Sequence, residues 1–154
     1  MHICSSRTLT RICYDSSYTV DQDIIIDFHY NYHILPAFTV FRSIEVAIAY
    51  WQQSGRSKIL PKQGTTFLEK QVRLSAANPS EKPEMTFDVA IRSVRGLRKY
   101  MTQYQRFGEY FVRIVYKSQF VGTINISEDD IPEGLNDTTT ATLDGQPSFT
   151  VASA

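Results

Sequence analysis

Four polar side chains that could perform acid-base or metal chemistry occupy alternate positions in the segment IIIDFHYNYHI, residues 24 to 34. They are Asp27, His29, Asn31 and His33. In an extended strand they share one face, with neighbours about 6 to 7 Å apart. Asp27 and His29 can therefore converge on one metal ion, whereas His29 and His33, about 13 Å apart, cannot without a bulge. A polar face against solvent or a neighbouring strand is the simpler interpretation, and a contact with a protein partner is a third.

The common motifs of nucleotide binding and catalysis do not occur in the sequence. It has no GxxxxGK[ST], GxGxxG, HExxH, GxSxG, CxxC or EF-hand pattern, and its only histidines are at positions 2, 29 and 33. Cys4 and Cys13 match no metal or nucleophile pattern, so we interpret them as reduced thiols on an N-terminal strand. We assign no catalytic residue, no metal and no cofactor.

A second candidate site is strongly basic. Residues 92 to 117 carry seven cations against one acid, Glu109, with aromatic side chains interleaved. From this segment we select five candidate binding residues: Arg95, Arg98, Lys99, Arg106 and Arg113. Such a face can bind phosphates or an acidic protein surface. It can also be a solvated helix face, or the acidic C-terminal tail can fold back over it so that the charges satisfy each other within the molecule.

Charge is divided unevenly along the chain although the total is zero, from 16 basic and 16 acidic residues. Residues 1 to 55 carry a net −2, residues 56 to 117 a net +8, and residues 118 to 154 a net −6. Neutrality of the whole chain weakens non-specific affinity for nucleic acid, so the basic segment favours a protein partner.

Apolar periodicity predicts the elements that position these residues. A period of two is clearest in 24–34 and recurs in 85–92, 110–116 and 120–126, while 66–74 is a weaker strand. The last two alternating runs are joined closely enough to form an antiparallel hairpin. A period of 3.6 predicts one helix from the N-cap Ser43 to Ser54 and another from the N-cap Ser93 to Phe107, stopped by Gly55 and Gly108.

The predicted fold class is α+β: a single domain with an antiparallel or mixed sheet of about five to six strands and two helices packed on one face. The domain spans residues 1–127, and residues 128–154 form an acidic, Thr-rich tail whose 149–151 segment can add an edge strand. No signal peptide and no apolar run long enough for a membrane helix is recognisable, so we expect a soluble, cytoplasmic protein with no membrane partner.

These observations favour a non-catalytic protein-binding module. An inhibitor, an immunity-type partner and an assembly subunit all fit, with another protein of acidic surface as the partner. One alternative is a nucleic-acid-binding protein that uses the basic helix 93–107. A further alternative is a small metal-dependent enzyme that uses the polar strand face 27–33.

Overall fold

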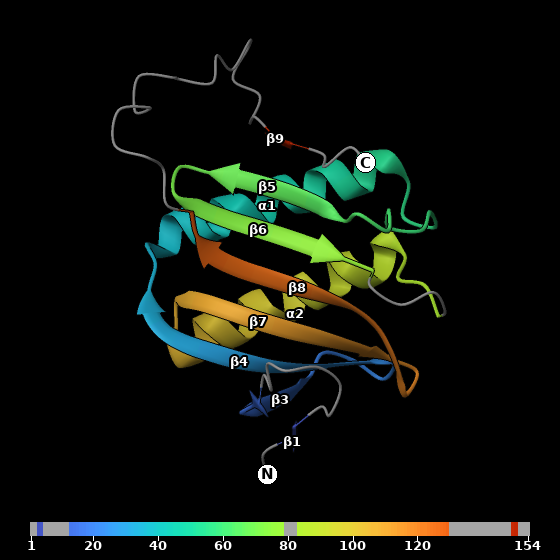
Figure 1. Ribbon diagram of the computed structural model, residues 1–154, viewed down its shortest axis with the longest axis horizontal. Helices are drawn as coiled ribbons and strands as arrows, with labels where there is room; N and C mark the ends of the chain where they lie inside the picture. Colours follow the sequence, from blue (N-terminus) through green and yellow to red (C-terminus); the bar gives the residue numbers. More distant parts are fainter. Residues whose placement is uncertain (1–2, 5–12, 79–82, 130–148, 151–154) are drawn as a thin grey trace.

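An antiparallel sheet with two helices on one face dominates the computed structural model, which describes residues 3–4, 13–78, 83–129 and 149–150 (Figure 1). The helices are α1 (Ala37–Ser54) and α2 (Phe87–Tyr104). The strands of the large sheet are β3 (Ser16–Thr19), β4 (Ile24–Ile34), β5 (Thr65–Glu69), β6 (Val72–Ala77), β7 (Gly108–Tyr116), β8 (Gln119–Glu128) and β9 (Phe149–Thr150). The short strands β1 (Ile3–Cys4) and β2 (Cys13–Tyr14) pair separately, with Cys4 opposite Cys13 in the backbone register.

The large sheet has the order β3-β4-β7-β8-β6-β5-β9, and each neighbouring pair is antiparallel. Both helices cover the same face, α2 behind β4 and α1 behind β5 and β6 (Figure 1). The α+β class, the antiparallel sheet and the pair of helices on one face are therefore confirmed. The sheet has one strand more than predicted for the domain itself, because the edge strand predicted in the tail is present as β9 and pairs with β5.

Two tight hairpins supply four consecutive inner strands of the sheet, β7-β8-β6-β5. The predicted β7–β8 hairpin is confirmed, with Lys117 and Ser118 both at positive φ in its turn. The prediction of a single strand over 66–74 is wrong, because the chain reverses between β5 and β6 at Lys70, whose φ is 51°. Neither turn has the Asn-Gly or Asp-Gly sequence that usually supplies positive φ, and this concealed the second reversal.

Helix α1 begins earlier than the sequence indicated. Its N-cap is Pro36, so the prediction of a Ser43 N-cap is wrong. Ser43 lies buried inside the helix, where its hydroxyl donates to the Val40 carbonyl oxygen at 2.7 Å. The predicted end is confirmed, because α1 stops at Ser54 and Gly55 follows at φ 106°.

Helix α2 occupies most of a segment that the alternating pattern assigned to a strand over 85–92, and that prediction is wrong. Its N-cap is Thr86 rather than Ser93, and the Thr86 hydroxyl accepts a hydrogen bond from the Val89 N–H at 3.4 Å. The first turns of α2 are buried nearly all round, so apolar side chains at every second position also suit a helix. The helix ends at Tyr104, and Gly108 begins β7 instead of capping it.

The core lies between the helices and the inner face of the sheet. Trp51 of α1 is fully buried, stands edge-on to Phe67 with ring centroids 5.6 Å apart, and donates from Nε1 to the Thr65 hydroxyl at 3.0 Å. The inner face of β4 contributes Ile24, Ile26 and Phe28. None of the helices in the described residues is long and apolar enough to span a lipid bilayer.

A close approach at Gly96 fixes how α2 lies against the β3–β4 connection. A Cβ atom there would lie 2.4 Å from Cγ2 of Val20 and 2.8 Å from its Cγ1. Alanine raises helix propensity by about 1 kcal/mol relative to glycine, but overpacking a core costs about 1 to 3 kcal/mol. We therefore expect Gly96→Ala to lower the free energy of unfolding by about 1 kcal/mol in urea titration. A gain in stability would show that α2 does not approach Val20 this closely.

Candidate functional site

A stripe of polar and basic side chains runs along the outer face of α2. Arg95, Arg98, Lys99, Thr102 and Gln103, here called the basic stripe, line an open depression of about 500 Å³. Their spacing of three and four residues places them one above another on a helix. The structure thus brings together three of the five candidate binding residues.

The cations of the basic stripe differ in what they contact. The Arg98 guanidinium lies 4.9 Å from the centroid of the Phe41 ring, and its Nη1 is 3.8 Å from Oε1 of Glu45 on α1. Arg95 and Lys99 are exposed, and no carboxylate of the described residues lies within ion-pair distance of either. Two positive charges of the stripe are therefore presented to solvent without compensation from this part of the chain.

Arg106 lies just beyond α2, at the end of the basic stripe. Its side chain is exposed, and its carbonyl oxygen accepts a hydrogen bond from the Tyr110 hydroxyl at 2.7 Å. Burial, with smaller contributions from Tyr100 and Tyr30, raises the pKa of the Tyr110 phenol above its ordinary value. Tyr110 therefore remains a neutral donor and holds the backbone of Arg106 in place.

The fifth candidate, Arg113, does not join the basic stripe. The alternate β7 residues Tyr110, Val112 and Ile114 face the helices, so Arg113 points to the opposite face of the sheet. There its guanidinium lies 5.1 Å from the centroid of the Phe120 ring. A single flat partner cannot contact Arg113 and the basic stripe at once.

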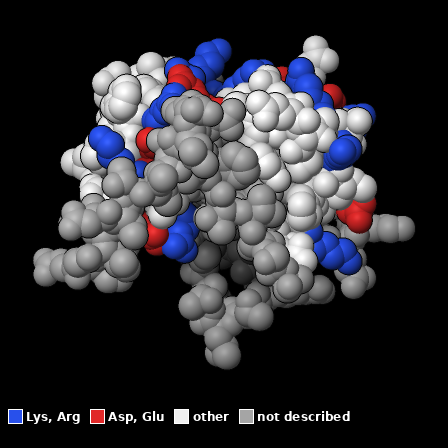
Figure 2. All heavy atoms as spheres, turned by 90° about the horizontal axis from the view of Figure 1, so that it is seen from above, with Lys and Arg blue, Asp and Glu red and all other residues white. Residues whose placement is uncertain are grey.

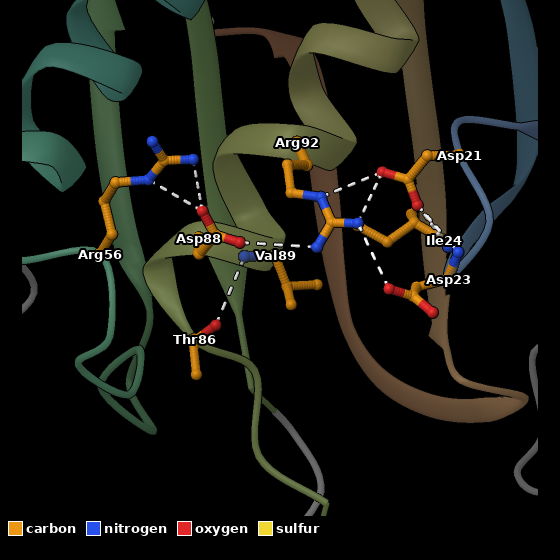
Figure 3. Close-up of polar contacts among 8 residues, drawn as sticks. All are labelled: Asp21, Asp23, Ile24, Arg56, Thr86, Asp88, Val89 and Arg92. Carbon is orange, nitrogen blue, oxygen red and sulfur yellow. Dashed lines mark hydrogen bonds and ion pairs between the residues drawn. The ribbon is translucent and has the colours of Figure 1, made fainter.

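Arg92, another cation of the basic segment, has a structural role (Figure 3). Its Nη2 lies 2.7 Å from Oδ2 of Asp21 and 3.7 Å from Oδ2 of Asp23, and its Nη1 lies 3.5 Å from Oδ2 of Asp88. Asp88 also pairs with Arg56 from the segment that follows α1. Arg92 therefore joins the β3–β4 turn to the first turns of α2, and its charge is engaged within the molecule.

Asp21 titrates abnormally because of this network. Partial burial raises the pKa of its carboxyl, but the Asp23 N–H, Arg92 and the Ile24 N–H together lower that pKa below the ordinary 3.8. A lowered pKa contributes stability above the unfolded-state value and loses it as the pH falls through the folded-state value. We expect the wild-type protein to have a larger free energy of unfolding than Asp21→Asn at neutral pH. The difference between the two should vanish at acid pH, where the Asp21 carboxyl is protonated. A pH-independent difference in urea titrations would contradict this.

The polar face of β4 consists of separate pairs. His29 Nδ1 lies 2.5 Å from Oδ2 of Asp15, and His33 Nε2 lies 2.5 Å from Oε2 of Glu128. Asn31 donates to Oε2 of Glu109 at 2.8 Å. Within the described ranges, no three His, Cys, Asp or Glu side chains are grouped so that they could hold a metal ion. Asp27, the fourth predicted member of this face, is buried. The face is therefore a polar sheet surface on which His29, Asn31 and His33 bond to neighbouring parts of the chain.

Sequence reasoning missed an exposed apolar cluster at the end of the sheet where β4 leads into α1. Tyr32 is 76% exposed, Ile34 78% and Phe38 75%, and Tyr104 at the end of α2 is 50% exposed. We call these four residues the aromatic end. The alternation of apolar residues in 24–34 would place Tyr32 and Ile34 on the core face of the strand. In the structure the last four residues of β4 are exposed, so Tyr32 and Ile34 do not reach the core.

Charges of both signs share the surface elsewhere. Figure 2, which looks onto the edge of the sheet that carries β9, shows Lys and Arg side chains at several separate places with Asp and Glu between them. Mixed charge of this kind produces no extended field of one sign on the described part of this surface.

Comparison with known proteins yields no relative: no protein-family model matches the sequence, and no curated protein and no solved structure is significantly similar to it.

Proposed function

We propose that this protein is a non-catalytic binding module that uses the basic stripe to bind an acidic surface on another protein. One observation carries the proposal: Arg95 and Lys99 project from an open depression, and no carboxylate of the described residues pairs with them. Like charges four residues apart on a helix repel each other, so this arrangement costs stability unless negative charge from outside the described residues lies against it, which we propose a partner supplies. An inhibitor and an assembly subunit both remain compatible with such a module.

The contrast with Arg92 supports this proposal. Arg92 is surrounded by three carboxylates of its own chain, whereas Arg95, one turn further along α2, points to solvent. A cation that serves the fold has its counterions within the fold. The exposed pair Arg95 and Lys99 has the properties expected of residues that recognise another molecule.

Nucleic acid is the rival partner, and the aromatic residues of α2 do not favour it. Tyr100 is 8% exposed and packs edge-on to Phe28 with ring centroids 4.6 Å apart, so it cannot stack on a base. A tyrosine that serves as a stacking platform needs an accessible ring face. Tyr100 therefore gives the basic stripe no stacking surface, and Tyr104, which is 50% exposed, is the one aromatic ring of α2 that a base could reach.

Capture from a lysate of the native source tests the proposal. The tagged full-length protein is incubated with the lysate at low and at moderate salt, with and without nuclease. Mass spectrometry of the eluate detects bound protein, and ultraviolet absorbance detects bound nucleic acid. We expect a stoichiometric acidic protein that survives nuclease. Recovery of nucleic acid alone, lost on nuclease treatment or at moderate salt, would contradict the proposal.

A further inference from the structure

The aromatic end is unusual because it carries several large apolar side chains that are each half or more exposed. Tyr32, Ile34 and Phe38 are each about three-quarters exposed and fall within seven residues of one another. They lie where β4 passes into α1, the same end of the molecule at which α2 gives way to β7 (Figure 1). Clustered exposed apolar surface on a folded domain marks a site of contact.

Buried aromatic rings pack against two residues of the aromatic end. The Tyr32 ring stands edge-on to Tyr30 with centroids 4.9 Å apart, and the Tyr104 ring lies 4.6 Å from that of Tyr100. Leu35 donates its N–H to the Phe107 carbonyl oxygen at 3.2 Å, which ties the β4–α1 connection to the end of α2. A rigid apolar surface loses little entropy when it is covered, so it suits a binding anchor.

The charge around the aromatic end selects the partner. Arg98 lies over Phe41, which in turn packs edge-on to Phe107, so the basic stripe borders this end directly. Arg42 and Arg106 are exposed, and no carboxylate of the described chain is within ion-pair distance of either. The acids Glu109 and Glu128 bond to Asn31 and His33 on the face of the sheet opposite the helices. On the helix side of this end, the exposed cations Arg42 and Arg106 supply positive charge.

From this combination we infer that the aromatic end is the apolar anchor site for an acidic, amphipathic segment of the partner. Apolar side chains of that segment cover Tyr32, Ile34 and Phe38, while its carboxylates pair with Arg42, Lys99 and Arg106. A second copy of this chain fits less well, because it would bring the same arginines toward each other. The inference rests on the proposed function and specifies the chemistry of the partner.

Selection of a random-peptide phage library on the immobilised full-length protein tests this. We expect the enriched peptides to combine Asp and Glu with large apolar residues. A purified enriched peptide should bind Ile34→Ser/Phe38→Ser at least tenfold more weakly than wild type. The matched control Ile25→Ser/Ile59→Ser removes two exposed apolar side chains elsewhere and should leave the affinity unchanged. Thermal unfolding of both variants verifies that they fold.

Other results would show whether the inference about the aromatic end fails alone or the proposed function fails with it. One such result is that acidic peptides fail to bind Arg95→Glu/Lys99→Glu and yet bind Ile34→Ser/Phe38→Ser with wild-type affinity. That result would overturn this inference and leave the proposed function intact. Enriched peptides without acidic residues would overturn both. Concentration-dependent dimerisation that Ile34→Ser/Phe38→Ser abolishes would overturn the inference in favour of a second copy. Loss of binding to anionic phosphatidylserine vesicles in the same variant would overturn it in favour of a lipid surface.

Discussion

Arg95→Glu/Lys99→Glu is expected to weaken binding of the captured partner about 100-fold, which corresponds to about 2.7 kcal/mol. Each substitution replaces an attraction to an acidic surface with a repulsion, so the two effects reinforce one another. Folding should be unaffected, because both side chains are exposed and the new pair repels at the same spacing as the old one. Fluorescence anisotropy with labelled partner measures the change.

Lys58→Glu/Lys62→Glu is the matched control. These two lysines are also exposed and four residues apart in the sequence, but they lie in the connection from α1 to β5. The substitution changes the net charge by the same amount, so it reports any effect of overall charge. Equal losses in the two double variants would show that binding follows total charge rather than the basic stripe.

Arg92→Leu is expected to lower the free energy of unfolding by about 2 kcal/mol, the magnitude typical of losing hydrogen bonds between charged, partly exposed groups. Its removal leaves Asp21 and Asp23 without their cation, while Asp88 keeps its ion pair with Arg56 (Figure 3). The Arg92 side chain is 27% exposed, so solvent compensates for only part of the loss. Urea titration at neutral pH measures the change.

Arg95→Leu provides the control for Arg92→Leu, because it removes an arginine from the same helix at an exposed position. We expect a change of less than about 0.5 kcal/mol, as for most surface substitutions. If the two variants were equally stable, Arg92 would not link the β3–β4 turn to α2. Its classification as a structural residue, distinct from the basic stripe, would then be wrong.

Much of the fold could be predicted from local patterns. Apolar residues at every second position from Ile24 to Ile34, with polar residues between them from Asp27 onward, predict β4, since a half-buried strand must repeat every two residues. The β7–β8 hairpin follows from two such runs with a short connection. The pattern failed at Phe87, Val89 and Ile91, where burial on several sides of a helix also gives apolar residues at every second position.

The candidate site was predictable only in part. The helical spacing of Arg95, Arg98 and Lys99 places them together because a helix is a local structure. The pairing of Arg92 with Asp21 joins residues 71 positions apart, so no local pattern distinguishes Arg92 from the other cations. The 76% exposure of Tyr32 and the register shift of β4 between Asn31 and Ile34 are features of the tertiary arrangement, which the alternation of apolar residues does not reveal.

Lysine footprinting of the complex tests the central claim without changing the sequence. The free protein and the complex are treated with an acetylating reagent, and the rate of modification at each lysine is read by mass spectrometry. If an acidic protein binds the basic stripe, acetylation of Lys99 slows at least fivefold in the complex, about 1 kcal/mol of protection, while Lys58 and Lys62 react as before. An unchanged rate at Lys99 would place the partner elsewhere and contradict the account.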